Sequence, residues 1–324
     1  MVVNAGIFIL TQNTPERKIY LKTTLYFLFR HFNKIFNYPV IILHEKDYDV
    51  NSQNEIIQSI RENNRHLISF KKVDDTDFQL PSHIDEKKVE KIVELQPVPY
   101  WRNMKYRQMC YFWIKHFFKY TDGFDYVMRL DDDSIIEEQI TSDVFETMME
   151  KDLVYASNIV HVDCGICNFG MKELFEEALP QHKDKINSGL FIQSKLTSGN
   201  DHFNRFKKVV SIVNDCDSDV SEYITNMPFM YYNNFFVAST NFWKQDDVRD
   251  LIDKIDKHGG IFYYRYGDAP IQTLIVSLLV PEKITRTVFR YSKRLQREVF
   301  VDNSGGFHSY MPKTYDCSSC IIKK

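Results

Sequence analysis

Residues 126–133 have the sequence Tyr-Val-Met-Arg-Leu-Asp-Asp-Asp, a short apolar run that leads directly into three acids. The run from Tyr126 to Leu130 has the length and the side chains of a buried β-strand. The triplet Asp131-Asp132-Asp133 therefore stands where this strand would end. In open α/β sheets, ligands bind beyond the carboxyl ends of the strands. The stretch thus indicates an α/β sheet with an acidic ligand site at one strand end.

Upstream of this stretch, strand and helix signals alternate along the chain. Apolar residues from Val2 to Leu10 indicate a buried first strand. Thr14-Pro15-Glu16 has the features of a helix start: a capping hydroxyl, a proline in the first turn and an acid at the positive end. Further strands are expected at Val40 to Leu43 and Leu67 to Val73, with a polar helix near Gln53 to Asn63 between them. This alternation predicts a parallel sheet with helices on its faces.

The remaining segments are less regular. The charged, turn-rich segment from Asp74 to Pro99 is expected to be a surface excursion, and a dense aromatic helix is expected from Tyr106 to Phe118. In the second half we expect helices from Asp246 to Asp256, closed by Gly259-Gly260, and from Pro270 to Leu279. The sequence shows no internal repeat or low-complexity linker, which favours a single domain over residues 1–324.

The composition excludes several classes of protein. The chain has 324 residues, of which 44% are hydrophobic and 26% charged, and its net charge is −3, so it lacks the basic excess of a nucleic-acid binder. No run of about 18 apolar residues occurs, and no basic region precedes Val2 to Leu10, so we expect neither a transmembrane segment nor a signal peptide. Six cysteines are too few for a disulfide scaffold. These features favour a soluble protein of a reducing compartment such as the cytoplasm.

Two pairs of cysteines have a spacing that suits metal binding. Cys164-x-x-Cys167 and Cys317-x-x-Cys320 could together supply four thiolates to a tetrahedral zinc ion. The two pairs lie in distant parts of the chain, and neither is in an obvious zinc knuckle. The alternatives are four unrelated thiols or a redox-sensitive pair at the C-terminus.

The acidic triplet has the chemistry of a divalent-cation site. If the strand geometry continues, Asp131 and Asp133 point to one side of the sheet and Asp132 points to the other. Hard cations prefer oxygen ligands, and such a cation can act as a Lewis acid on a leaving diphosphate. The alternative is a solvated acidic turn that closes the strand. Arg129 could hold a phosphate or pair with one of the acids.

Two stretches match the motifs of a known family. Residues 106–112 are Tyr-Arg-Gln-Met-Cys-Tyr-Phe, and residues 259–270 are Gly-Gly-Ile-Phe-Tyr-Tyr-Arg-Tyr-Gly-Asp-Ala-Pro. They resemble the Tyr-Arg-x-Met-Cys-Arg-Phe and Gly-Gly-Phe-Phe-Tyr-Glu-Arg-Trp-Gly-Asp-Ala-Pro motifs of the fungal GDP-mannose-dependent α-1,2-mannosyltransferases. Weaker similarities occur in the family's order at Asn234-Phe235, Asn241-Phe242-Trp243 and Gly306-Phe307-His308.

The resemblance implies a fold and a reaction. The fold would be a glycosyltransferase A-type α/β domain, with a mostly parallel, Rossmann-like sheet flanked by helices and a smaller mixed region on the acceptor side. Residues 1–135 would form the nucleotide-sugar-binding half, and residues 136–324 the acceptor-side half. The reaction would move mannose from GDP-mannose to a glycan or glycoconjugate hydroxyl, with retention of configuration and with Mn²⁺ or another divalent cation.

The resemblance also implies roles for individual residues. Asp131 and Asp133 match the family's acidic metal ligands, and His308 matches a histidine that completes the metal shell. Tyr106 and Arg129 match positions near the donor, and Asp131 belongs to the donor site as well. Tyr106 is also an expected catalytic group. Family members have an N-terminal membrane anchor that this chain does not show, which favours a soluble microbial or viral enzyme.

The acceptor side contains the main departure from the family. Asp268 lies where the family has a carboxylate beside the acceptor, and it or a diphosphate oxygen would receive the acceptor's proton. Asn234 and Tyr264 are further expected acceptor-side residues. Phe236, however, replaces the glutamate proposed as the family's nucleophile. Three alternatives follow. The acceptor attacks from the face that the nucleotide leaves, another carboxylate serves as the nucleophile, or the protein is an inactive relative that binds glycans or nucleotides.

Overall fold

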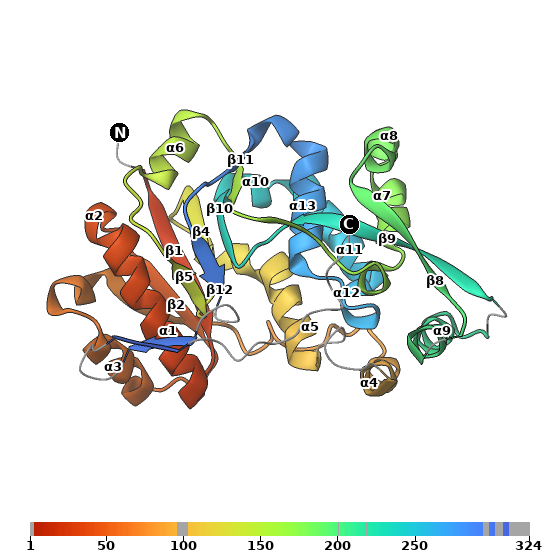
Figure 1. Ribbon diagram of the computed structural model, residues 1–324, viewed down its shortest axis with the longest axis horizontal. Coiled ribbons are helices and arrows are strands. Elements are labelled where there is room, and N and C mark those ends of the chain that lie inside the picture. Colours follow the sequence, from red (N-terminus) through yellow and green to blue (C-terminus); the bar gives the residue numbers. More distant parts are fainter. Residues whose placement is uncertain are drawn as a thin grey trace.

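The structure is a computed structural model that describes residues 3–95, 103–199, 201–217, 220–293, 298–301 and 307–310. Its centre is a seven-stranded sheet (Figure 1). In chain order the strands are β1 (Ala5–Thr11), β2 (Val40–His44), β3 (Ile68–Lys72), β4 (Tyr126–Leu130), β6 (Tyr155–Ser157), β10 (Phe235–Ser239) and β11 (Ile284–Arg286). Their spatial order is β11-β6-β10-β4-β1-β2-β3.

The expected mostly parallel sheet is confirmed. β1 pairs in parallel with β2 and β4, β2 with β3, and β11 with β6. β10 is the strand of this sheet that runs antiparallel to its neighbours, β4 and β6. Because β6, β10 and β11 come from the second half of the chain, both halves contribute strands to the same sheet.

Helices cover both faces of the central sheet. One face carries α1 (Pro15–Leu28), α3 (Val50–Ser59) and α6 (Val144–Glu150). The other carries α5 (Met104–Tyr111), α11 (Asp246–His258) and α13 (Asp268–Leu279). Consecutive side chains of β1 show why two layers form. Phe8 points to the core on the side of α5, whereas Ile7 and Ile9 point to the core on the side of α1.

Local sequence signals explain where key helices begin and end. The Thr14 side chain accepts a hydrogen bond from the amide of Arg17, and Pro15 occupies the first helical position of α1, as expected. Helix α11 ends at Gly259, whose φ of 74° lies in the left-handed region. At Gly260, an added Cβ would lie 2.1 Å from the ring of Tyr266. Glycine is therefore required there for close packing.

The segment expected to be a surface excursion contains a helix, α4 (Glu86–Leu95). Its Val89 and Ile92 are fully buried in the same core as α5. The expectation was wrong here because many charged residues surround an apolar stripe with a spacing of three residues, at Val89, Ile92 and Leu95. One buried stripe is sufficient to fold such a segment onto the core.

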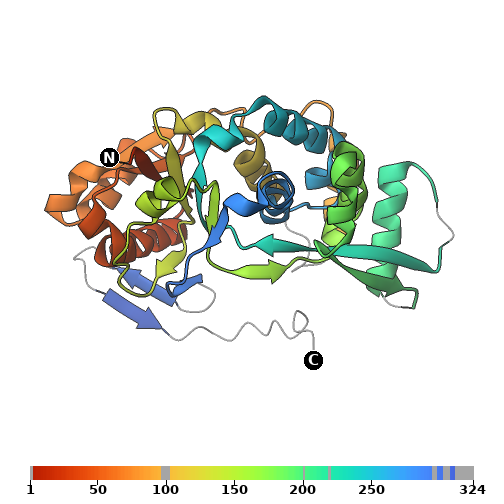
Figure 2. The same cartoon turned by 90° about the horizontal axis from the view of Figure 1, so that it is seen from above.

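A smaller region extends from one side of the central sheet (Figures 1 and 2). It contains a three-stranded antiparallel sheet in the order β7-β9-β8. Its elements are β7 (Val160–Val162), α7 (Met171–Ala178), α8 (Lys183–Asn187), β8 (Phe191–Thr197), α9 (Asp201–Asn214) and β9 (Glu222–Tyr231). Strand β9 packs against α13, which connects this region to the central sheet.

The structure also contains short α-helices and strands. They are α2 (Lys34–Phe36), β5 (Ser134–Ile136), α10 (Thr240–Trp243), α12 (Gly260–Tyr263), β12 (Tyr291–Lys293), β13 (Glu298–Val301) and β14 (Phe307–Tyr310). β5 pairs with β12, and β13 pairs with β14 and lies against α1. In the part of the chain that the structure describes, no helix combines the length and the apolar character needed to cross a bilayer.

Candidate active site

The acidic triplet forms a tight turn directly after β4. The amide of Asp131 donates to the carbonyl of Asn234 (2.9 Å), and the amide of Ser134 donates back to the carbonyl of Asp131 (3.0 Å). The second bond closes a turn, so the alternation of side chains along β4 does not continue. The expectation that Asp131 and Asp133 share one side, opposite Asp132, was therefore wrong.

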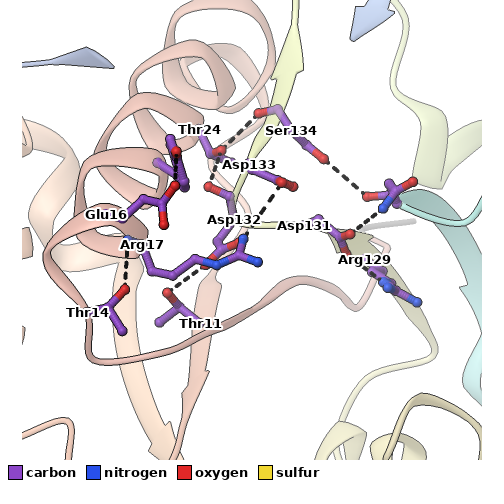
Figure 3. Close-up of polar contacts among 12 residues, drawn as sticks. Thr11, Thr14, Glu16, Arg17, Thr24, Arg129, Asp131, Asp132, Asp133 and Ser134 are labelled. Atoms are coloured by element: carbon purple, nitrogen blue, oxygen red, sulfur yellow. Dashed lines mark hydrogen bonds and ion pairs between the residues drawn. The ribbon is translucent and has the colours of Figure 1, made fainter. Parts of the chain in front are cut away.

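Instead, Asp132 and Asp133 both face Arg17, from the first turn of α1 (Figure 3). The Arg17 guanidinium lies 2.6 Å from an oxygen of Asp132 and 3.7 Å from an oxygen of Asp133. Both acids are almost completely buried, whereas the Arg17 side chain remains 36% exposed. Arg17 thus has the solvent access that a group contacting a bound anion needs.

Asp132 is anchored within the fold. The Thr11 hydroxyl donates to its carboxylate (2.8 Å), and the Thr24 hydroxyl lies 2.8 Å from its carbonyl oxygen. Burial raises the pKa of the Asp132 carboxyl to about 7, although Arg17 lowers it and Asp133 raises it further. These contacts join the acidic turn to the end of β1 and to the middle of α1.

Asp131 belongs to a second ionic group that reaches across the sheet edge. Arg129, the next-to-last residue of β4, donates from Nε to Asp131 (2.9 Å) and from a terminal nitrogen to Asp268 (2.5 Å). Arg129 is 1% exposed, and its guanidinium lies 3.9 Å from the centroid of a Trp113 ring. Burial alone would lower the pKa of Arg129, but Asp131 and Asp268 raise it above its usual value.

Asp268 is the first residue of α13 and is 4% exposed. Besides Arg129, it accepts a hydrogen bond from Nδ2 of Asn233 (2.8 Å), and the same amide group lies 3.0 Å from Oε1 of Gln272. Asn234 donates from its side chain to Asp131. The structure therefore brings Arg129, Asp131 and Asp268, three residues that the sequence singled out, into one network.

The acids at this sheet edge offer the type of ligand atom that a hard divalent cation prefers. In the described part of the chain, Arg17 contacts the carboxylates of Asp132 and Asp133, and Arg129 contacts those of Asp131 and Asp268. Carboxylate oxygens are the ligands that Mg²⁺, Mn²⁺ and Ca²⁺ prefer. Among the described residues, however, no three His, Cys, Asp or Glu side chains converge as a metal site.

The third expected metal ligand, His308, lies in β14, and its side chain is outside the described residues. The backbone of the hairpin formed by β13 and β14 lies against α1, the helix that carries Arg17. Its role as a ligand stays a prediction.

Tyr106 lies on α5 and faces the other end of the network. The Arg265 guanidinium is 5.7 Å from its ring centroid. The neighbouring Cys110 and burial raise the pKa of the Tyr106 phenol well above its usual value, and Asp268 contributes to this rise. Tyr106 is therefore a neutral hydrogen-bonding group close to Asp268, and its catalytic role stays a prediction.

Phe236 and Tyr264 are both enclosed by other side chains. Phe236 on β10 is fully buried opposite Arg129, and its ring lies 5.4 Å from that of Tyr155. Tyr264 is 5% exposed and contacts the rings of Phe169 and Tyr266. Their acceptor-side roles are not tested by these contacts and stay predictions.

A cavity of about 250 Å³ opens at the carboxyl ends of β1, β2 and β3. Its wall includes Thr11 at the end of β1, Glu45 after β2, Val73 after β3, and Lys105 and Gln108 from α5. Because Thr11 also bonds to Asp132, the cavity adjoins the acidic turn. Its place agrees with the rule that ligands of α/β sheets bind beyond the strand ends.

Sequence reasoning missed Arg17, Thr11 and Asn233. For Arg17, a signal existed: the helix start at Thr14-Pro15 follows the first strand directly, so the first turn of that helix lies at the sheet edge where the acids lie. Finding the contact, however, required knowing that β1 and β4 are neighbours.

Comparison with known proteins shows which family the chain belongs to. A family model described as "Glycolipid 2-alpha-mannosyltransferase" matches residues 2–292. The chain belongs to this family. Glycolipid 2-alpha-mannosyltransferase 2 of Candida albicans is 26% identical over 261 residues, which are 78% of this chain and 50% of that protein. Alpha-1,2 mannosyltransferase KTR1 of Saccharomyces cerevisiae is 24% identical over 254 residues, 77% of this chain and 58% of that protein. The chain thus spans about half the length of the curated relatives that it matches.

Two solved structures of similar proteins have the same fold. The mannosyltransferase Ktr4p of S. cerevisiae, in complex with GDP, superposes with a TM-score of 0.72 at 18% identity, over 90% of this chain and 71% of that one. Core-mannan synthase A of Aspergillus fumigatus, in its Mn/GDP form, gives a TM-score of 0.70 at 19% identity, over 98% and 79%. This member of the family therefore has the glycosyltransferase A-type fold that its sequence predicted.

Proposed function

We propose that the protein is a retaining, metal-dependent glycosyltransferase that moves mannose from GDP-mannose to a hydroxyl of a glycan or glycoconjugate. The observation that carries this proposal is the network from Asp131 through Arg129 to Asp268, at the carboxyl end of β4. Membership of a mannosyltransferase family supports the transferred sugar. The GDP bound to Ktr4p and the Mn/GDP form of core-mannan synthase A support the nucleotide and the metal.

The chain's own residues divide the donor site into two parts. The cavity at the ends of β1, β2 and β3 would take the nucleoside, because it adjoins the acidic turn through Thr11. Asp131 and Asp133, with His308, would hold a divalent cation, which neutralises charge on the leaving diphosphate when bound. Arg17 is the partly exposed cation at this turn and would contact the diphosphate.

On the acceptor side, the residues favour attack from the face that the diphosphate leaves. Phe236 has no group that can attack the anomeric carbon, and it is enclosed in the core. Asp268 is a carboxylate held in place by Arg129 and Asn233, and it or a diphosphate oxygen would accept the proton of the acceptor hydroxyl. Arg129 donates hydrogen bonds to both Asp131 and Asp268. One side chain would therefore set the position of the donor-side carboxylate relative to the acceptor-side carboxylate.

The direct test measures the release of GDP from GDP-mannose, with Mn²⁺ or with EDTA. The release of UDP and CMP from their sugars is measured in parallel. We expect release from GDP-mannose with Mn²⁺, and a loss of about 10² or more in Asp133→Asn, because an amide is neutral and a poorer ligand. Asp122→Asn is the matched control, since Asp122 is an exposed carboxylate paired with Lys244. Turnover that persists in EDTA would exclude the metal role. Binding of GDP without release from any donor would instead identify an inactive, nucleotide-binding relative.

A further inference from the structure

A tight loop holds two cysteines together beside the candidate active site. Within the loop, the side chain of Asn168 donates to the carbonyl of Cys164 (2.8 Å), and the amide of Asn168 donates to the carbonyl of Gly165 (3.2 Å). An added Cβ at Gly165 would lie 2.6 Å from the hydroxyl oxygen of Thr225 on β9, so the loop rests directly on this strand. These contacts fix the backbone of the turn that connects Cys164 and Cys167.

The two thiols lie in contact and differ in environment. Cys167 is fully buried, whereas Cys164 is partly exposed, and both are free cysteines. The thiol of Cys167 is hydrogen-bonded to the sulfur of Cys164, and this bond lowers the pKa of Cys164 to about 7. Burial raises the pKa of Cys167 well above its usual value. A partly exposed cysteine with thiolate character, hydrogen-bonded to a buried thiol, is the arrangement of reactive dithiol pairs.

The pair contacts a residue of the active-site region. A hydrogen bond joins Cys167 and Arg265, which is also paired with Asp163 (3.4 Å) and lies over the ring of Tyr106. Arg265 is 8% exposed and has a φ of 75°, a left-handed conformation that is strained for arginine. Three residues further along the chain is Asp268. A change at Cys167 would therefore reach Tyr106 through the Arg265 side chain, and Asp268 through the backbone that follows Arg265.

We propose that Cys164 and Cys167 form a thiol–disulfide exchange site, which a small-molecule disulfide oxidises reversibly and which acts on Arg265. In the first step, the Cys164 thiolate attacks one sulfur of a disulfide such as glutathione disulfide and releases one thiolate. Cys167 then gives up its proton, attacks the Cys164 sulfur of the mixed disulfide and expels the second thiol. Two protein thiols are oxidised, and the small disulfide is reduced to two thiols.

The site itself is tested by peptide mapping of the full chain, which does not depend on any activity. Cleavage after Lys151 and Lys172 gives a tryptic peptide, 152–172, that contains Cys164 and Cys167 and no other cysteine. After treatment with glutathione disulfide, we expect this peptide to lose the mass of two hydrogen atoms and to regain it with dithiothreitol. The exposed Cys216 is an internal control, and should gain a glutathione adduct instead.

Three outcomes of the mapping would overturn the proposal. They are an unmodified peptide 152–172 alongside modified Cys216, a stable glutathione adduct on Cys164, and a cross-link to the peptide with Cys317 and Cys320. Copurifying zinc that prevents oxidation of Cys164 and Cys167 would overturn it as well, in favour of a metal site.

The effect on Arg265 rests on the proposed function and is measured separately. GDP release from GDP-mannose should fall by about fivefold or more on oxidation, within the usual range of coupling between sites. It should recover with dithiothreitol, and it should not respond to oxidation in Cys164→Ser. Cys216→Ser is the matched control and should respond like the natural chain. A fully formed disulfide with an unchanged rate would refute the coupling.

If the reduced protein releases no GDP, the proposed function fails and the thiol site remains testable. The rise in melting temperature caused by GDP with Mn²⁺ then serves as the readout, because it requires binding but no turnover. A smaller rise for the oxidised protein would support the coupling, and equal rises would refute it.

Discussion

Replacing Phe236 with glutamate introduces a carboxylate into a closed layer of side chains on the central sheet. The Phe236 ring is fully buried between Tyr155 (5.4 Å) and Phe117 (6.4 Å), measured between ring centroids. The nearby Arg129 guanidinium, 6.0 Å from the ring centroid, is already shared by Asp131 and Asp268. The new acid would therefore gain little from Arg129 and would bear most of the cost of its burial.

The expected size of the effect follows from that burial. A fully buried glutamate without its own partner has its pKa raised by about 3 units, which corresponds to about 4 kcal/mol at neutral pH. Loss of the ring contacts adds roughly 1–2 kcal/mol. At about 2 °C per kcal/mol for a domain of this size, the melting temperature should fall by roughly 10 °C.

The pH dependence separates the charge from the lost packing. Because the folded-state pKa of the new acid is raised, the charge penalty is absent below the unfolded pKa of about 4.3 and grows as the pH rises toward the folded pKa. Urea unfolding of Phe236→Glu and Phe236→Gln should be compared from about pH 5 to about pH 7. The glutamate variant should lose about 1.4 kcal/mol per pH unit relative to the glutamine variant, which has nearly the same shape and no charge.

The same proteins test the proposed same-face attack through the rate of GDP release. We expect Phe236→Glu to be slower than the natural chain and Phe236→Leu to keep most of the rate, since leucine preserves an apolar wall. A glutamate variant with pH-independent stability and a faster rate would refute this reasoning. That result would show that position 236 can hold a working nucleophile, and that the natural chain is an impaired member of its family.

Three further predictions concern the network, the packing and the donor. Arg129→Met should lower the free energy of unfolding by about 3–5 kcal/mol in urea unfolding, because it removes a buried cation from Asp131 and Asp268. Lys244→Met, which breaks an exposed ion pair, should leave the stability nearly unchanged. Gly260→Ala should destabilise the protein by about 1–3 kcal/mol, since its Cβ would overlap the Tyr266 ring, and an unchanged melting temperature would contradict this packing. GDP with Mn²⁺ should raise the melting temperature by several degrees more than UDP or CMP, and equal shifts would point to another sugar nucleotide.

Much of the site could be predicted from short stretches of sequence. The triplet Asp131-Asp132-Asp133 is adjacent to its strand, and the motif that contains Asp268 is contiguous, so both were found without coordinates. Arg129 was expected beside the acids because it lies two residues before Asp131. By contrast, α4 was missed because its apolar stripe is hidden among charged residues, and only its burial against the core reveals it.

The sequence by itself determined the elements whose signals are local. The cap at Thr14, the glycine at the end of α11 and the apolar run of β4 act within a few residues, so each specifies its element almost independently of the rest. The place of the acidic triplet at a strand end was likewise evident from the sequence around it.

Only the tertiary structure decided which of these groups meet. The ion pair of Arg17 with Asp132 joins residues 115 positions apart, and that of Arg129 with Asp268 joins residues 139 positions apart. Both depend on the order of strands around β4 and on the turn that ends it, and neither property is encoded in a short window. Folding must bury these charges, and a buried charge is tolerated only beside a partner. The long-range packing that brings the partners together therefore determined the site's final geometry.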